Sequence, residues 1–402
     1  MKLVQINSAA NSGSTGRIAE EIGAAAIERG YSSSIAYGRH AQPGTSKYYR
    51  VGGLPNALLH GVESFLFDRH GLGSKRATRR LIDWMEVQEP DAVGLHNIHG
   101  YFLNYPILFD FLRRTGTPTI WTLHDCWPFT GHCSYFDRFD CLKWQDECYD
   151  CPMTQYYPRS LLDFSRRNFN LKRNEFRGLP NLVVVTPSKW LKDNVKQSFL
   201  SDYRVKVINN GIDISIFRPA EQCVSDGLVL GVANVWDKRK GLLDFVKLRD
   251  LLPSSFRIVL IGVTKSQSRQ LPASVRGIER TENIQELVSW YNKATVFVNP
   301  TYSDNFPTTN LEALACGVPV VTYNVGGSPE PLNHETGRIV APDDIKGLGR
   351  AIKELAQGDR ERISNACRSR AEALFNKDDR FSDYVDLYET LIGERENPLG
   401  RS

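Results

Sequence analysis

Residues 303–321 of the chain read SDNFPTTNLEALACGVPVV. The β-branched runs at 295–298 and 318–322 predict strands on either side, and the residues between them predict a short helix over 309–315. A strand, a helix and a second strand in this order form the parallel unit of an α/β fold. Asp304 follows the first strand and Glu312 lies early in the helix. The segment therefore places two carboxylates beside a helix start, whose free N–H groups attract anions.

The same alternation continues in both directions from this segment. It predicts further strands over 2–6, 33–37, 92–96, 119–123, 182–186, 228–232, 257–261 and 337–340. The helices between and after the strands fall at 16–29, 78–88, 105–114, 161–177, 241–251, 284–293, 345–357, 359–374 and 378–392. We predict an α/β protein of two doubly wound, Rossmann-like domains, 1–205 and 206–376, facing a cleft. A C-terminal helix and tail, 377–402, is expected to cross back to the first domain. In such sheets, ligands bind beyond the carboxyl ends of the strands.

Composition narrows the functional classes. The 402 residues are 41% hydrophobic and 24% charged, with a net charge of +4. A disordered chain and a dedicated nucleic-acid binder are excluded on these values. No apolar run approaches the ~20 residues that span a bilayer, and the first residues lack a signal-peptide pattern, so we expect a cytoplasmic protein.

Three further polar segments follow predicted strands. The turn NSGSTGR at 11–17 offers backbone N–H groups to an anion, although an ordinary flexible turn explains it equally well. His124 ends a strand and could hydrogen-bond a reacting group, or it could be a structural histidine paired with Asp125. Lys238-Arg239-Lys240 could bind a diphosphate, or it could be a solvated basic loop. His96 and His99 end the preceding strand, and we expect them to support the site or the packing.

Taken together, these motifs resemble one family. Asp304, seven residues, Glu312 and then Ala-x-Ala-x-Gly-x-Pro-Val-Val are similar to the signature of the retaining group 1 glycosyltransferases, glycosyltransferase family four, which have the GT-B fold. The glycine-rich turn, His124, residues 210–213 and Lys240-Gly241 occur in the family's order. WTLHDCW at 121–127, with the cysteine-rich segment after it, resembles bacterial colanic-acid and other exopolysaccharide glycosyltransferases.

The resemblance implies roles for individual residues. Glu312 would hold the ribose of a nucleotide-sugar donor and Asp304 its sugar, while Lys240 would neutralise the leaving diphosphate. Gly16 would meet that diphosphate from the other domain, and His124 would contact the transferred sugar. The backbone N–H groups of the segment Asn305, Phe306, Pro307 and Thr308 would also approach the diphosphate. His124, Asp304 and Lys240 would be the catalytic residues.

Two positions depart from the family pattern. The family usually has Glu where this chain has Asp304, which is expected to alter the preference for the sugar. It usually has Arg where this chain has Asn234, so one donor-binding cation is missing. We expect Arg239 or Lys238 to replace it.

The implied activity is the transfer of a hexosyl group, with retention, from a UDP- or GDP-linked donor to a glycan or a lipid-linked glycan acceptor. Synthesis of bacterial exopolysaccharide, capsule or lipopolysaccharide is the expected setting. No cofactor is expected for the chemistry, because no Asp-x-Asp occurs in the chain and fixed cations can stabilise the diphosphate. The alternatives are a sugar-nucleotide epimerase of the same fold and a nonenzymatic nucleotide-sugar-binding subunit.

Four cysteines in a short segment allow three interpretations. Cys133, Cys141, Cys148 and Cys151 could hold a structural zinc, form two disulfides or remain free thiols. We favour zinc by a small margin. Cys223, Cys316 and Cys367 are expected to be small packing residues.

A basic segment follows the apolar residues 58–67. Its cations are Arg69, Lys75, Arg76, Arg79 and Arg80. The region could rest on anionic lipid as a peripheral membrane contact, or it could be a core helix followed by a solvated basic loop.

Overall fold

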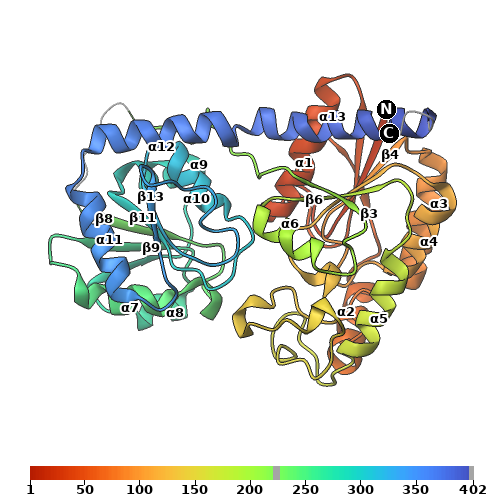
Figure 1. The fold of residues 1–402 in the computed structure, drawn as a ribbon, viewed down its shortest axis with the longest axis horizontal. Coiled ribbons are helices and arrows are strands. Elements are labelled where there is room, and N and C mark those ends of the chain that lie inside the picture. Colours follow the sequence, from red (N-terminus) through yellow and green to blue (C-terminus); the bar gives the residue numbers. More distant parts are fainter. Residues whose placement is uncertain (221–226, 398–402) are drawn as a thin grey trace. The chain divides into compact units, whose positions relative to one another are not determined.

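The chain divides into two compact units (Figure 1). The computed structural model describes residues 1–220 and 227–397. Unit 1 comprises Met1–Asn209 together with the chain from Arg380 onward, and unit 2 comprises Asn210–Asp379. The chain therefore passes between the units twice, close to the positions 205/206 and 376/377 that the sequence predicted as domain limits.

Unit 1 contains a seven-stranded parallel sheet of order β3-β2-β1-β4-β5-β6-β7. Its strands are β1 (Lys2–Asn7), β2 (Ser32–Tyr37), β3 (Lys47–Arg50), β4 (Ala92–Leu95), β5 (Thr119–Thr122), β6 (Leu182–Thr186) and β7 (Arg204–Val207). Its helices are α1 (Gly13–Glu28), α2 (Leu54–Phe67), α3 (Lys75–Gln88), α4 (Tyr105–Thr115), α5 (Ser165–Phe176) and α6 (Lys189–Lys196). The last helix, α13 (Lys377–Glu396), begins in unit 2 and runs into unit 1.

Unit 2 contains a six-stranded parallel sheet of order β10-β9-β8-β11-β12-β13. Its strands are β8 (Leu228–Val232), β9 (Arg257–Ile261), β10 (Val275–Ile278), β11 (Val296–Asn299), β12 (Val320–Tyr323) and β13 (Gly337–Val340). Its helices are α7 (Leu242–Leu251), α8 (Lys265–Gln270), α9 (Ile284–Lys293), α10 (Thr308–Ala315), α11 (Ile345–Gln357) and α12 (Arg360–Phe375).

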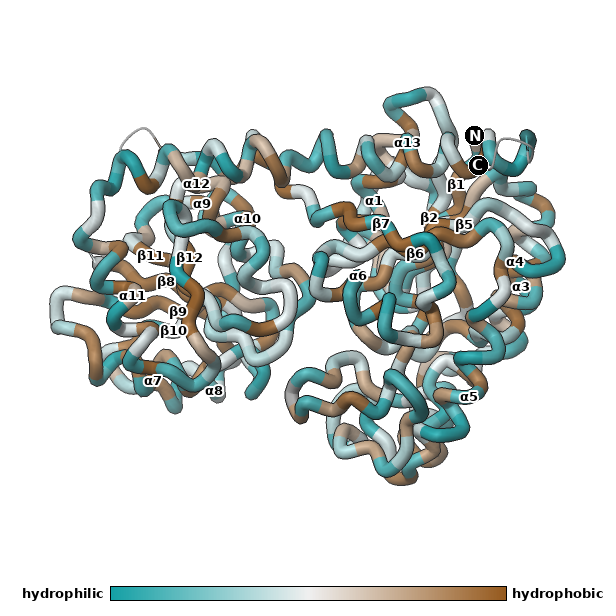
Figure 2. Tube along the Cα trace, in the orientation of Figure 1, coloured by the Kyte–Doolittle hydropathy of each residue, from teal (hydrophilic) through white to brown (hydrophobic). Residues whose placement is uncertain are grey.

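Both sheets are buried on their two faces, which explains the continuous apolar character of their central strands (Figure 2). Successive residues of a strand point to opposite faces. In β1, Val4 packs into the cluster shared with α3, α4 and α5, whereas Leu3 packs into the cluster shared with α1 and α13. In unit 2, Val320 and Val321 divide in the same way between the clusters of α10 and α11.

The strand order determines where polar loops gather. In unit 1 the order reverses between β1 and β4, and in unit 2 it reverses between β8 and β11. The loops that leave these strand pairs diverge to opposite faces and leave a crevice at the carboxyl edge, which is where doubly wound sheets bind ligands. The segments at 11–17, 96–99, 234–240 and 300–305 all begin at these two points.

Some elements were not predicted from the sequence. The strands β3, β7 and β10 lie at sheet edges or next to them and carry charged or half-exposed residues, so they lack an apolar run. The helices α6 and α8 were also missed, and the helix predicted over 161–177 begins only at Ser165. For residues 58–67 a helix was only one of two interpretations, and α2 spans Leu54–Phe67. Among the described residues, no helix has both the length and the apolar composition needed to cross a bilayer.

The packing of α13 on unit 1 gives a direct test. Phe381 is 4% exposed and lies in the cluster of α1 and α13, whereas Thr390 is an exposed residue of the same helix. We expect Phe381→Ala to lower the free energy of unfolding by about 3–5 kcal/mol, because it leaves a cavity in the core. Thr390→Ala should change it by less than about 0.5 kcal/mol. Urea denaturation measures both, and equal effects of the two substitutions would contradict the packing of α13.

Candidate functional site

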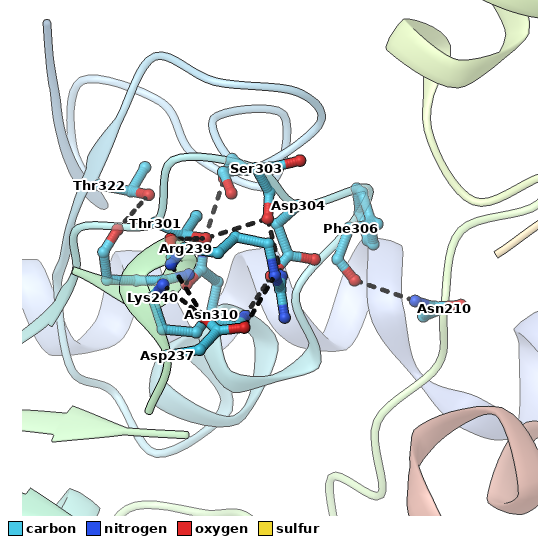
Figure 3. Close-up of polar contacts among 12 residues, drawn as sticks. Asn210, Asp237, Arg239, Lys240, Thr301, Ser303, Asp304, Phe306, Asn310 and Thr322 are labelled. Atoms are coloured by element: carbon cyan, nitrogen blue, oxygen red, sulfur yellow. Dashed lines mark hydrogen bonds and ion pairs between the residues drawn. The ribbon is translucent and has the colours of Figure 1, made fainter. Parts of the chain in front are cut away.

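Two cations and one carboxylate meet at the carboxyl ends of β8 and β11 (Figure 3). Lys240 Nζ donates to Asp304 Oδ2, and the Arg239 guanidinium lies 3.9 Å from the same oxygen. The three side chains are only 14–25% exposed. Partial burial weakens the screening of these charges by water. Arg239 Nε also lies 3.8 Å from Asp237 Oδ2. With the adjacent Lys238, the turn 237–240 and Asp304 carry three cations and two carboxylates, so one positive charge remains in excess where the sheet order reverses.

The backbone before the cluster is held by an aspartate. Asp237 Oδ1 accepts from the backbone N–H groups of Arg239 and Lys240, at 2.9 and 3.1 Å. Gly241 then takes a positive φ of 70°, and a Cβ atom there would lie 2.2 Å from the carbonyl oxygen of Pro300. This close approach requires glycine. It brings the basic turn against the loop that carries Asp304.

The Asp304 backbone is fixed by a glycine pair from another loop. Gly327 N–H donates to the Asp304 carbonyl oxygen at 3.1 Å. A Cβ at Gly326, whose φ is +56°, would lie 2.0 Å from that same oxygen. Sequence reasoning missed these glycines, although a Gly-Gly pair soon after a strand is a recognisable turn signal.

The helix α10 starts directly after Asp304. Pro307 is its N-cap residue and supplies no side-chain cap, so the start of the helix stays available to an anion. Pro307 has no N–H of its own, and within the predicted segment only Asn305, Phe306 and Thr308 can donate. Asn210 Nδ2 donates to the Phe306 carbonyl oxygen at 3.0 Å and holds this turn.

Glu312 lies on α10 and is 6% exposed. The Tyr291 hydroxyl donates to Glu312 Oε2 at 2.8 Å. Burial and the neighbouring Glu312 raise the pKa of Tyr291 well above its ordinary value, so the tyrosine remains a donor. Tyr291, which sequence reasoning missed, therefore orients Glu312, the residue that was predicted to hold the ribose.

The two candidates for the missing cation occupy different positions. Arg239 donates to the Ser303 carbonyl oxygen at 2.8 Å and points toward Asp304 (Figure 3). Lys238 and Asn234 are exposed residues of the loop. Of the two candidates, Arg239 is therefore the one placed to replace the arginine that the family has at the position of Asn234.

In unit 1, α1 begins at Gly13 rather than at Gly16, where the predicted helix began. Gly16 is buried, and a Cβ there would lie 3.2 Å from the Ala9 carbonyl oxygen, so it packs the helix onto the preceding loop. The exposed residues at the helix start are Gly13 and Ser14, and the N-cap residue Ser12 makes no side-chain cap.

His124 follows β5 and stacks on His96, with 5.3 Å between the ring centroids. The two rings also share a hydrogen bond of 3.1 Å between His96 Nδ1 and His124 Nε2. On its other side, His96 Nε2 lies 3.0 Å from Gln5 Oε1, and Gln5 Nε2 donates to the Ala19 carbonyl oxygen at 2.7 Å. These contacts form one chain from Ala19 to His124.

The chain of hydrogen bonds determines the tautomer of His124. The Ala19 carbonyl can only accept, so Gln5 Oε1 accepts from His96 Nε2–H. Burial lowers the pKa of His96 well below its ordinary value, which keeps it neutral and leaves Nδ1 as an acceptor. His124 must then donate from Nε2. Burial lowers the pKa of His124 to about 4, so its Nδ1 carries a lone pair at neutral pH.

The interpretation of His124 as a structural histidine paired with Asp125 is wrong, because Asp125 pairs with another histidine. Its Oδ2 lies 3.0 Å from His99 Nε2, and His99 Nδ1 lies 3.2 Å from the Tyr157 hydroxyl. Within the described residues, no partner is found for His124 Nδ1, and this atom remains free to accept from a ligand.

The four clustered cysteines line one small pocket together with His132. The described cysteines form no disulfide, which contradicts the interpretation of the cluster as two disulfides. Among residues 1–220 and 227–397, no group of three or more His, Cys, Asp or Glu is placed to hold a metal ion. The zinc site at Cys133, Cys141, Cys148 and Cys151 stays a prediction. Cys316 and Cys367 are buried as expected, and Cys223 lies outside the described residues.

Comparison with known families matches both units. Residues 15–216 match the family described as Glycosyltransferase Family 4, and residues 227–358 match the family described as Glycosyl transferases group 1. The putative colanic acid biosynthesis glycosyl transferase WcaC of Escherichia coli K12 is 25% identical over 415 residues, covering 97% of this chain and 100% of the relative.

Solved structures share the fold. Sucrose-phosphate synthase from Thermosynechococcus elongatus superposes with a TM-score of 0.72 at 16% identity, covering 98% of this chain and 99% of that one. HepE from Anabaena, in complex with UDP and glucose, gives a TM-score of 0.65 at 13% identity, covering 99% and 100% of the two chains. The two parallel sheets with their helices therefore form a GT-B fold.

The hydrogen-bond chain predicts the protonation of His124. In ¹⁵N NMR we expect its neutral Nε2–H tautomer at pH 7 and a titration midpoint at about pH 4. His96→Phe removes the acceptor, so both tautomers should appear, and the spectrum of His124→Gln identifies the signals. The pKa of a histidine in the unfolded chain is about 6.5, so below that pH the unfolded state binds the proton that folded His124 does not bind. The stability that neutral His124 contributes above about pH 6.5 is therefore lost as the pH falls toward about 4. A midpoint near pH 6.5 in the folded protein, or an Nδ1–H tautomer, would contradict the arrangement.

Proposed function

The chain belongs to glycosyltransferase family four, the group 1 glycosyltransferases, and from that premise we propose that it transfers a sugar from a nucleotide-linked donor to a glycan or lipid-linked glycan, with retention at the anomeric carbon. The observation that carries the proposal is the cluster of Arg239, Lys240 and Asp304 beside the start of α10. The comparisons give the epimerase alternative no support.

Arg239 and Lys240 bind the donor diphosphate in this proposal. Arg239 is also paired with Asp237, at 3.8 Å, so the turn 237–240 and Asp304 together carry three cations and two carboxylates, and the remaining positive charge favours the binding of an anion. When the bond from sugar to diphosphate breaks, negative charge grows on the leaving oxygen. Fixed cations and the N–H groups at the start of α10 stabilise that charge without having to reorganise. A protein acid is therefore not needed to protonate the leaving group.

Asp304 and Glu312 hold the hydroxyl groups of the donor. Glu312 Oε2 accepts a hydrogen bond from the Tyr291 hydroxyl. Because an ionised carboxylate can only accept hydrogen bonds, Glu312 suits a group that donates one, such as a ribose hydroxyl. Asp304 is paired with Lys240, so donor binding exchanges part of this contact for one to the sugar. Because the Asp side chain is one methylene shorter than Glu, the hydroxyl group that it reaches differs, and with it the preferred sugar.

We propose that the acceptor attacks from the same face as the leaving diphosphate, and that a diphosphate oxygen takes its proton. His124 accepts a hydrogen bond from the transferred sugar through Nδ1, the atom that the contact with His96 leaves unprotonated. No metal ion takes part, since Arg239 and Lys240 supply the charge that a metal would supply. Gly16 contributes by packing α1 so that its start meets the donor.

The donor is UDP- or GDP-linked, and the relative from E. coli supports a role in exopolysaccharide synthesis through its printed name. Lipid-linked acceptors for such polymers are present at the inner face of the plasma membrane, where we propose that the enzyme works. Its contact with the bilayer is then peripheral.

The three adjacent cations allow a matched test of the donor site. Lys240→Ala should lower kcat about 10²–10³-fold, because it removes a charge aimed at the leaving group. Arg239→Ala should act in the same direction, whereas Lys238→Ala, which removes an exposed charge from the same turn, should leave kcat unchanged. Donor hydrolysis and transfer are measured with a set of nucleotide sugars. If Lys240→Ala stays within a few-fold of the wild type, the assignment is wrong, and no turnover with any donor favours the binding-subunit alternative.

The stereochemistry of the product tests the reaction type. An α-linked nucleotide sugar should give an α-linked product, read from the anomeric coupling constant by NMR. The same assay in excess EDTA should keep its rate, because the charge on the diphosphate is balanced by side chains. A β-linked product would contradict retention, and a rate that EDTA abolishes and Mg²⁺ restores would contradict metal independence.

A further inference from the structure

The helix α2 has its apolar residues on the outside of unit 1. Leu54, Leu58, Leu59 and Val62 are 65%, 62%, 63% and 53% exposed. At 100° per residue they occupy one side of the helix. A surface helix of a water-soluble domain normally buries such a stripe, so α2 is inverted. This excludes the interpretation of residues 58–67 as a core helix.

The inner face of α2 is polar, which shows why the helix sits this way. Its buried residues are His60 and Ser64. His60 Nε2 accepts from the backbone N–H groups of Gly71 and Gly73 at 3.1 and 3.2 Å, and His60 Nδ1 lies 2.8 Å from Ser74 Oγ. The imidazole therefore anchors α2 through hydrogen bonds and fixes the leucines toward the outside. Glu63 is the one charged residue in the helix.

A second segment extends the apolar surface. Leu161 and Leu162 are 58% and 47% exposed, and Leu161 N–H donates to the Phe65 carbonyl oxygen at 2.7 Å. That bond joins the two segments across nearly a hundred residues of chain. The bond places Leu161 beside the last turns of α2, so exposed apolar residues of both segments lie in one region of unit 1, which is the pattern of an interaction site.

A cationic pocket lies just beyond the C-terminal end of α2 and is linked to that helix by the ion pair of Arg69 with Glu63. Arg69 follows α2, Lys75 and Arg79 lie in the first turns of α3, and Arg167 lies in α5, and these four side chains line one surface pocket (Figure 1 gives the helices). Arg69 lies 3.7 Å from Glu63. Among the described residues, no carboxylate forms an ion pair with the other three. Four cations that share one carboxylate create a positive potential that favours a bound anion.

From these observations we propose that the α2 surface and its pocket dock on an anionic lipid bilayer, with the leucines in the headgroup–acyl boundary and a lipid phosphate in the pocket. An apolar helix face next to Lys and Arg is the combination that binds such interfaces. A second copy of this chain suits the surface poorly, since a symmetric contact would bring two cationic pockets together. The inference deepens the proposed function and rests on it for the choice of partner.

Vesicle flotation tests the proposal with the full chain. The wild type should bind vesicles of equal parts phosphatidylcholine and phosphatidylglycerol at low salt, and bind phosphatidylcholine alone weakly. Lys75→Ala/Arg79→Ala should weaken binding about 25-fold, since each cation near an anionic surface contributes about fivefold. Leu58→Gln/Leu59→Gln should weaken it by at least about tenfold.

Matched controls separate docking from general charge and hydrophobicity. Lys346→Ala/Arg350→Ala removes the same charge from α11, and Val87→Gln removes an exposed apolar residue at the far end of α3. Both should bind vesicles like the wild type. Every variant should keep the wild-type turnover on a water-soluble acceptor, which distinguishes a failure of docking from a failure of the proposed activity.

The outcomes decide between occupants. No flotation of the wild type with anionic vesicles at low salt overturns the proposal, as does equal binding by the docking variants and their controls. Self-association in analytical ultracentrifugation that Leu58→Gln/Leu59→Gln abolishes, without vesicle binding, would assign the surface to a second copy instead. Inorganic phosphate that saturates the pocket without any vesicle binding would assign it to a soluble anion.

Discussion

The positive charge held at the carboxyl ends of β8 and β11 is the constraint on which the site of unit 2 depends. Arg239 and Lys240 approach one carboxylate, Asp304, and none of the three side chains is fully in water. Asp237, Gly241 and the Gly326 loop hold the backbone on both sides of these side chains. In the proposed function a donor diphosphate balances this charge, and the cations stabilise the negative charge that grows as the bond from sugar to diphosphate breaks.

The central strands and the site motif could be predicted from the sequence because their residues carry local signals. A strand buried on both faces is a continuous apolar run, and β6, β8 and β9 lie where such runs predict them. The motif around Asp304 combines a strand end, a helix start and two acids within a few residues. The edge strands β3 and β7 gave no such signal, because each carries charged and half-exposed residues.

The partners of the site residues could not be predicted, because they come from distant parts of the chain. Tyr291 reaches Glu312, Gly326 reaches Asp304, and His99 takes the Asp125 carboxylate that the sequence suggested for His124. The orientation of helix α2 could not be predicted for another reason. Its pattern is apolar at helical spacing, but a polar histidine holds it to the core, so the rule that apolar residues face inward fails there.

The claim that Arg239 and Lys240 hold a diphosphate is tested most directly by isothermal titration calorimetry. The protein is titrated with the nucleoside diphosphate, UDP or GDP, that binds it, and with the nucleoside of the same base. The account predicts that the diphosphate binds at least about tenfold more tightly and that its affinity falls as salt is added. Equal affinities for the two compounds, unchanged by salt, would contradict it.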